Sequence, residues 1–312
     1  MMQMQKLFGL VLVLLATAGL AGCSVNPATG DQNFTGFMSL DDEQRIGATE
    51  HPKILKSFGG AYKDQAVITY VNNIGNQLAA KSELPNITWT FTVLNSPQIN
   101  AFALPGGYVY VTRGLMALAS SEAELAGVMA HEIGHVTGRH TAQRYSKATG
   151  ASVLGAILGI AVGSSAVSEL FNVGAGLYLK SFSREQEFEA DSLGVRYLSR
   201  TNYDTKSMAS FLSKLRSHSQ LEAKRHEKDP SSVDQGNMFA THPRTIDRVQ
   251  RAIKNAKGAK SGTRLGTVDY MERLHKMLYG DDPKEGFIKG RTFIHPELQF
   301  RFEVPEGFRL FN

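Results

Sequence analysis

The chain has 312 residues, of which 42% are hydrophobic and 20% charged, with a formal net charge of +5. This is the composition of a globular protein, and the length allows one sizeable core plus an appendage. A single cysteine excludes intramolecular disulfides as a source of stability.

The N-terminus is typical of a bacterial lipoprotein signal. Lys6 precedes an apolar run of 14 residues, 7–20, which has the length of a secretory signal core and is short for a bilayer span. The sequence LAGC at 20–23 reads as a lipobox, which predicts cleavage before Cys23 and lipid on it. Several acyl chains on one residue anchor firmly. Serine rather than aspartate at position 24, directly after the cysteine, resembles the signal that sorts lipoproteins to the outer membrane. We therefore expect an envelope protein that faces the periplasm. An exported protein of this kind is not expected to bind nucleic acid.

The chain up to residue 112 is expected to hold two helices and a small sheet. After a polar linker, the pattern predicts a helix from about Leu40 and a long helix from about Gln65 to Lys81. Strands are expected at 88–94, 100–104 and 108–112. This mixture favours a mainly helical α+β domain.

A further helix is expected over residues 122–147. Ser121 stands three residues before Glu124, which is a capping-box pattern at a helix start. Apolar residues then recur at helical spacing through the segment. We therefore predict one continuous helix.

This helix carries the motif His131-Glu132-Ile133-Gly134-His135, the HExxH signature. Four residues turn through ~400°, so the two imidazoles lie only ~40° apart on one face and can hold one metal ion. Glu132 can reach a metal-bound water. The motif is typical of zinc peptidases.

A catalytic zinc site usually takes three protein ligands plus water, so a third ligand is needed. One plan places a histidine six residues after the second one, with glycine between; Gly138 fits, but the sixth position is Thr141 and His140 comes one residue early. On a continuous helix His140 also points ~180° away from His131. We therefore interpret His140 as a surface or outer-layer histidine.

The other plan takes a glutamate from a later helix, and the segment 183–191 offers candidates. Glu187 and Asp191 share a helix face, so one can bind metal while the other accepts the outer N–H of a ligand histidine. Glu185 and Glu189 form a neighbouring face, which favours solvent or an arginine partner. Spacing alone leaves both pairs open.

Between these segments, residues 151–179 are rich in glycine, alanine and aliphatic side chains. The first apolar run, 151–163, has 13 residues, and Glu169 interrupts the remainder. This favours a buried or cleft-covering helical pair over a membrane-dipping hairpin. Later helices are expected at 208–215 and after Pro243.

The C-terminal part is expected to be a β appendage. A linker at 258–266 and a short helix around 271–278 precede strands at 292–294, 299–304 and 308–311. The chain stops on apolar residues without evident partner strands. We expect a truncated β-domain, or an edge that the main domain or another chain covers.

HEIGH at 131–135, followed by Arg184-x-x-Glu187-x-x-Ala190-Asp191, resembles the zinc metallopeptidase family that includes HtpX, BepA, the Oma-type proteases and the CAAX prenyl endopeptidases. Further matches are NAFALPGG at 100–107 and Thr241-His242-Pro243 with Arg248. The resemblance covers roughly residues 40–255 and is nearest to the lipoprotein, BepA-like branch. It implies a zincin-type domain whose small sheet has an edge strand bordering the cleft.

The resemblance implies a single zinc ion per chain with Glu132 as general base; its ligands would be His131, His135 and Glu187. It also implies that Asp191 does not bind the zinc itself but contacts one of the zinc ligands. His242 and Arg248 are implied to lie near the active site. In the BepA-like branch, the histidine matching His242 can occupy the fourth zinc position and hold the enzyme latent.

Such a site would hydrolyse peptide bonds. Two neutral imidazoles and one carboxylate leave zinc positive, which lowers the pKa of bound water to about 7 and polarises the scissile carbonyl. Glu132 would take the water's proton and hand it to the leaving amine. Arg248 or His242 is a candidate donor to the oxyanion.

An extended peptide could add to the edge strand, with its side chains in pockets. The expected substrate-binding residues are therefore those of the strand, Asn100, Ala101, Phe102 and Ala103. The expected organisation is a signal peptide at 1–22, a linker at 23–36, the peptidase domain at 37–257 and the appendage at 258–312.

Two functions from different classes remain. The first is a lipid-anchored zinc endopeptidase that trims misassembled or surplus envelope proteins, with envelope assembly machinery as a partner. The second is a chaperone-like or scaffold lipoprotein that holds clients in the same cleft, with its zinc capped by His242. The full set of zinc ligands and Glu132 favours the enzyme.

Overall fold

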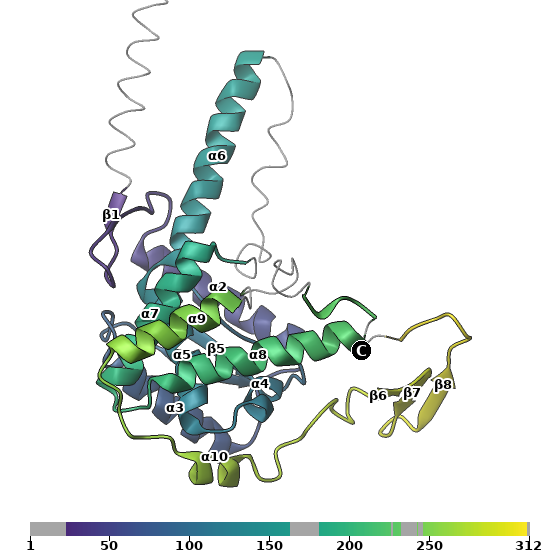
Figure 1. The fold of residues 1–312 in the computed structure, drawn as a ribbon. Coiled ribbons are helices and arrows are strands. Elements are labelled where there is room, and N and C mark those ends of the chain that lie inside the picture. The colour runs from purple at the N-terminus through teal and green to yellow at the C-terminus, as the bar shows by residue number, and fades with distance from the viewer. Residues whose placement is uncertain (1–22, 163–180, 226, 232–241, 243–245, 311–312) are drawn as a thin grey trace, which may run out of the picture.

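A computed structural model describes residues 23–162, 181–225, 227–231, 242 and 246–310 (Figure 1). The signal peptide expected at 1–22 lies outside the described residues. A helical body carrying small β-sheets confirms the expected α+β class.

The first described segment is a β-hairpin, where the sequence pattern predicted a linker. β1 (Cys23–Val25) pairs antiparallel with β2 (Gln32–Phe34). The prediction was wrong because the polar side chains Asn26 and Thr35 are buried against the domain instead of facing solvent. The hairpin is thus part of the folded body.

Two helices follow, each with a side-chain cap. α2 (Leu40–Ser57) begins after Ser39, which forms a capping box with Asp42. α3 (Gln65–Ala79) begins after Asp64, whose carboxylate accepts two backbone N–H groups of the first turn. Both helices begin where the sequence pattern predicted.

A three-stranded sheet packs against α2 and α3. Its order is β3 (Thr90–Leu94), β5 (Tyr108–Thr112) and β4 (Ala101–Leu104), with β5 parallel to β3 and antiparallel to β4. β4 is therefore an edge strand, as expected. A short helix that the sequence analysis did not anticipate, α4 (Arg113–Leu118), follows β5 directly.

The expected helix over 122–147 is two helices. α5 (Glu122–Thr137) is buried along its whole length, and α6 (His140–Val162) starts after a sharp turn. At this turn Gly138 caps α5, and Arg139 adopts a left-handed backbone conformation with φ 52°. Periodicity did not reveal the break because the residues on both sides keep helical patterning.

α6 runs into the apolar segment that begins at residue 151. Figure 1 shows its C-terminal half extending away from the rest of the body. The buried or cleft-covering helical pair was expected over 151–179, and most of that segment lies within 163–180, outside the described residues. Within the part of the chain that the structure describes, no helix combines the length and apolar character needed to cross a membrane.

Three later helices surround α5. α7 (Arg184–Arg200) and α8 (Lys206–Arg225) both pack on α5, and α9 (Ile246–Gly258) packs on α7 and α8. One apolar core joins these helices to α3 and to the sheet. The central helix is thus held from several sides, which fixes any side chain it presents to a cleft.

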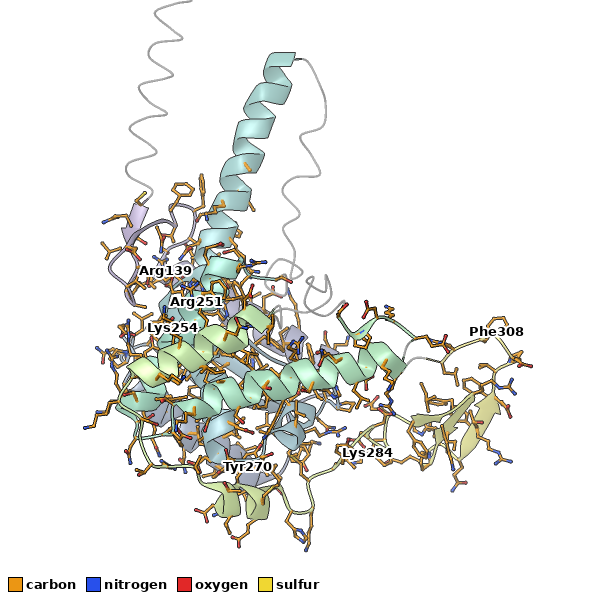
Figure 2. The ribbon with its side chains drawn as sticks, in the orientation of Figure 1. Arg139, Arg251, Lys254, Tyr270, Lys284 and Phe308 are labelled. Atoms are coloured by element: carbon orange, nitrogen blue, oxygen red, sulfur yellow. The ribbon has the colours of Figure 1, made fainter. Side chains whose placement is uncertain are left out.

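The C-terminal part stands off the body (Figure 1). α10 (Thr267–Leu274) attaches to the body through Tyr270, which is fully buried and donates to the Met116 carbonyl at 2.6 Å (Figure 2). Beyond it, β6 (Phe287–Lys289), β7 (Thr292–His295) and β8 (Phe300–Glu303) form an antiparallel sheet. β6 was not anticipated, and the described residues of the strand expected at 308–311 are irregular.

Candidate metal centre

The two motif histidines face the same point from α5. His131 and His135 are buried one helical turn apart, and their Nε2 atoms are 3.0 Å apart. Their Nδ1 atoms point away from this point toward other side chains. The helical spacing of the motif therefore produces the pair of converging nitrogen atoms that the sequence analysis expected.

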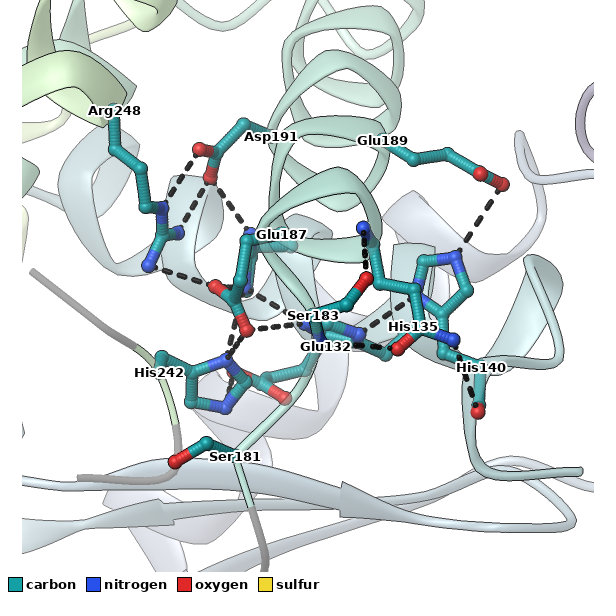
Figure 3. Close-up of polar contacts among 12 residues, drawn as sticks. Glu132, His135, His140, Ser181, Ser183, Glu187, Glu189, Asp191, His242 and Arg248 are labelled. Atoms are coloured by element: carbon teal, nitrogen blue, oxygen red, sulfur yellow. Dashed lines mark hydrogen bonds and ion pairs between the residues drawn. The ribbon is translucent and has the colours of Figure 1, made fainter. Parts of the chain in front are cut away.

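Glu187 from α7 and His242 complete a cluster of four donor residues (Figure 3). Each of the four side chains contributes one nitrogen or oxygen atom to the cluster, and these four atoms all lie within 4.8 Å of one another. Glu187 Oε2 is 3.5 Å from His131 Nε2, and Glu187 Oε1 is 3.6 Å from His135 Nε2. His242 Nδ1 lies 2.8 Å from Glu187 Oε1 and 3.3 Å from His131 Nε2.

The chemistry of this donor set fits zinc, which binds imidazole nitrogen and carboxylate oxygen. Glu132 points into the same region, and its Oε2 atom is buried without a hydrogen-bond partner among the residues that the structure describes. Burial lowers the pKa of His131, but hydrogen bonds with Asp191 and Glu187 outweigh it and raise the pKa to about 9. The cluster therefore attracts positive charge, as a cation site does.

His135 is instead held neutral. Burial in the cluster, followed by repulsion from His131, lowers its pKa well below the usual value. A metal ligand must offer a lone pair, so this neutral imidazole is already in the binding form.

Arg248 ties the carboxylates together. Its guanidinium pairs with both oxygens of Asp191, at 2.7 and 2.9 Å, and with Glu187 Oε2 at 2.7 Å. Burial alone would raise the pKa of Glu187, but Arg248 and His242 outweigh it and hold the pKa well below its usual range. Asp191 Oδ1 in turn lies 2.9 Å from His131 Nδ1. Arg248 thus lies at the site, as the resemblance implied, and supports two of its acidic residues, which differs from the oxyanion donor that the mechanistic argument suggested.

His140 and Glu189 both lie beside the donor cluster. His140 is fully buried, with its Nδ1 2.8 Å from His135 Nδ1, because the break after α5 turns it back toward the motif. Glu189 was interpreted as solvated or paired with an arginine; its Oε1 lies 3.4 Å from His140 Nε2. Neither is among the four donor residues, so of the two interpretations, surface and outer-layer, the structure supports the outer-layer one for His140.

An apolar pocket of about 50 Å³ adjoins the cluster. It is bordered by the polar side chains of His131, Glu132, His242 and Arg248, and its other walls come from β4 and the two residues before it, α4, α5 and α8. The wall residues are Ile99, Asn100, Ala101, Leu115, Val128, Met208, Phe211, Leu212 and Leu215. The last four belong to α8 and were not identified from the sequence, because a core helix and a pocket wall share the same apolar periodicity.

The edge strand therefore splits between two roles. Asn100 and Ala101 line the pocket, whereas the Phe102 ring stacks on Tyr110 with centroids 4.9 Å apart, on the other face. Ala103 lies in the core cluster. Alternation within β4 explains why Phe102 faces away from its neighbours Ala101 and Ala103, while Asn100 precedes the strand.

Comparisons with known proteins match this chain to peptidases. The model of peptidase family M48 matches residues 66–256. The beta-barrel assembly-enhancing protease of Yersinia pestis is 32% identical over 256 residues, or 78% of this chain and 50% of that protein. The protein of the same name from Escherichia coli strain K12 is 31% identical over 228 residues, or 70% of this chain and 45% of its own length.

A mitochondrial metalloendopeptidase, OMA1 of Arabidopsis thaliana, is 39% identical over 127 residues, or 40% of this chain and 25% of that protein. The chain spans about half the length of the beta-barrel assembly-enhancing proteases that it matches. The matched region contains α5 and α7, which supply His131, His135 and Glu187, and it also includes His242 and Arg248.

Proposed function

The chain belongs to peptidase family M48, in agreement with the resemblance carried by its motifs, and we propose that it is a zinc-dependent endopeptidase. One observation carries the proposal: His131, His135 and Glu187 converge beside Glu132, whose carboxylate points into the same site. A buried carboxylate adjoining a cation site is the arrangement that activates water for hydrolysis.

The three convergent side chains would hold the zinc ion. When bound there, zinc would polarise the scissile carbonyl and make an attacking water more acidic. Glu132 would accept the proton of that water and deliver it to the leaving amine. Asp191 would fix the tautomer of His131 by accepting its Nδ1–H, and Arg248 would keep Glu187 and Asp191 ionised and in place.

His242 would keep this site latent. Its ring lies against Glu187 and His131, and its Nε2 is 3.5 Å from Glu132 Oε1. A side chain in this position competes with a peptide for the region between the cation site and the general base. Removal of the ring would therefore open the site.

The His242→Ala variant is expected to cleave peptides about tenfold faster, which is the gain if the ring occupies the site about nine-tenths of the time. Initial rates on a fluorogenic casein substrate would measure the change. His295→Ala, in the appendage, serves as the control and should match the unchanged chain. A lower rate in His242→Ala would indicate that His242 takes part in catalysis and would contradict latency.

Extended peptides are the proposed substrates, with one apolar side chain seated in the pocket beside Glu132. Burying a leucine or phenylalanine side chain contributes about 1.5–3 kcal/mol, which corresponds to roughly 10–100-fold in kcat/KM. Peptides that differ only by leucine or aspartate next to the cleaved bond would test this. The same exchange four residues away should change the rate little, and equal rates for both peptides would exclude the pocket as a binding site.

The proposed location is the bacterial cell envelope. Cys23 would carry the lipid and anchor the protein at the outer membrane, facing the periplasm; in the structure Cys23 is exposed at the start of β1. The names of the relatives suggest envelope proteins and their assembly machinery as substrates and partners. Radiolabelled palmitate should be incorporated into the full chain and not into a Cys23→Ser variant.

A chaperone-like role remains the second candidate, because His242 lies inside the donor cluster. A protein that holds clients in a capped cleft would bind zinc without turnover. Zinc content of about one per chain with no hydrolysis, even in the His242→Ala variant, would favour this function over the peptidase.

A further inference from the structure

A chain of polar contacts leads from the donor cluster to the N-terminal hairpin. His135 Nδ1 is 2.8 Å from His140 Nδ1, and His140 Nε2 is 3.4 Å from Glu189 Oε1. The same oxygen of Glu189 accepts a hydrogen bond from Asn26 Nδ2 at 2.7 Å. His140 is fully buried and Asn26 is 2% exposed, whereas the Glu189 side chain between them is 25% exposed.

The protons along this chain have one consistent arrangement. His135 must keep the Nε2 lone pair free for a cation, so its proton is on Nδ1 and is donated to His140 Nδ1. His140 then carries its own proton on Nε2, the atom that faces the carboxylate of Glu189. Glu189 accepts a hydrogen bond from Asn26, and the same oxygen is the polar atom that faces His140 Nε2. Each group therefore selects the tautomer of the next one inward.

The turn after α5 is built to bring His140 to this place. A Cβ atom on Gly138 would lie 2.6 Å from His140 Nε2 and 3.0 Å from Glu189 Oε1, so only glycine leaves room for the pair. Arg139 holds a positive φ, a backbone conformation that is strained for a non-glycine residue. Its buried guanidinium offsets this strain by hydrogen bonds to Ser24, Thr35, Met38 and Glu43.

We propose that His140 is a positioning residue for the metal ligand His135, and that Asn26 of the hairpin completes this support through Glu189. The inference rests on the proposed zinc site. The two ligand histidines are then supported differently: His131 by a carboxylate of the neighbouring helix, and His135 through His140 by a segment near the N-terminus. Hydrogen bonds to the outer nitrogen of a ligand histidine fix its orientation and raise its basicity.

The hairpin that supplies Asn26 begins at Cys23, the proposed lipid attachment site. The same hairpin receives the Arg139 guanidinium at Ser24 and Thr35. Docking of the membrane-proximal segment and metal affinity are thereby coupled: undocking of the hairpin removes the outermost hydrogen bond of the chain that orients His135.

The direct test replaces His140 in two ways in the full chain, purified in detergent. His140→Phe keeps an aromatic ring but removes both nitrogens, and is expected to weaken zinc binding by about 10–100-fold. His140→Gln retains an oxygen that can accept from His135 and an amide N–H that can donate to Glu189, and is expected to bind within about threefold of the unchanged chain. Competition with a fluorescent zinc chelator measures the dissociation constants.

A second variant tests the hairpin at a distance from the metal. Asn26→Leu is close in size; it removes the donor to Glu189 and also the Oδ1 atom that accepts the Ala28 N–H within the hairpin turn. We expect zinc binding to weaken about 3–10-fold, less than on loss of His140. Gln32→Leu, at an exposed position of β2, is the matched control and should bind zinc as the unchanged chain does. Thermal unfolding of the zinc-free proteins identifies any variant that has lost its fold.

The outcomes separate this inference from the proposed function. If the unchanged chain binds no zinc, the proposed function fails. If the unchanged chain binds zinc and His140→Phe binds it equally well, the positioning role of His140 is overturned and the peptidase proposal stands. Equal losses in His140→Phe and His140→Gln would also overturn it, because a purely steric role would not distinguish them. Wild-type affinity in Asn26→Leu would remove the hairpin from the proposal.

Discussion

The Glu132→Gln variant is expected to bind about one zinc per chain and to hydrolyse peptides about 10²–10⁴-fold more slowly than the unchanged chain. Glutamine has nearly the same shape as glutamate, so the buried site keeps its packing. It carries no basic oxygen, and the attacking water then has no acceptor for its proton. Zinc content by elemental analysis and single-turnover rates on a quenched peptide would measure the two properties separately.

The reference for this experiment is Glu185→Gln, the same substitution at an exposed position of α7 two residues before Glu187. It should retain full activity. Because His242 adjoins Glu132, the Glu132→Gln and Glu185→Gln variants should also be compared in the His242→Ala background. The higher hydrolysis rate expected there makes a larger loss of activity measurable. Activity within threefold of the parent in Glu132→Gln would exclude Glu132 as the general base.

The donor cluster could be predicted because its geometry is largely local. HExxH fixes His131 and His135 on one helix face, and an i, i+4 pair fixes Glu187 and Asp191 on another. Spacing did not choose between this pair and Glu185 with Glu189; the resemblance did. In the structure Glu187 and Asp191 face the histidines, whereas Glu189 lies one step outward against His140.

The errors come from contacts between distant segments. Apolar periodicity continued through Gly138 and Arg139, so His140 was projected away from the site. The break depends on Arg139, whose guanidinium reaches the N-terminal hairpin and α2 about a hundred residues away in sequence. The hairpin was taken for a linker for the same reason: the polar side chains of Asn26 and Thr35 find partners that no local pattern reveals.

For the edge strand, the resemblance predicted the position of the strand but not the direction in which each side chain points. It placed residues 100–104 beside the cleft, and β4 is an edge strand whose first part lines the pocket. It did not separate Asn100 and Ala101, which reach the pocket, from Phe102, which packs on the opposite face. The side of a strand is set by its register with β5, and that register is a tertiary property.

Replacing Arg248 with methionine is expected to destabilise the zinc-free protein by about 3–5 kcal/mol. Arg248 is 3% exposed and pairs with Asp191 and Glu187, which are equally buried. Methionine keeps much of the length of the side chain, but it leaves two buried carboxylates without the guanidinium that pairs with both. Both would be forced either to take up protons or to draw in water.

Urea unfolding in the presence of a chelator, and again with excess zinc, would measure this effect. Arg251→Met is the control: Arg251 lies on the same helix, exposed, 4.2 Å from the centre of the Phe188 ring, and its loss should cost no more than about 1 kcal/mol. Zinc should recover part of the stability of Arg248→Met, since it would compensate Glu187 directly and leave Asp191 without its guanidinium partner. Equal stability of the two methionine variants without zinc would contradict the view that Arg248 holds the acidic residues of the site in place.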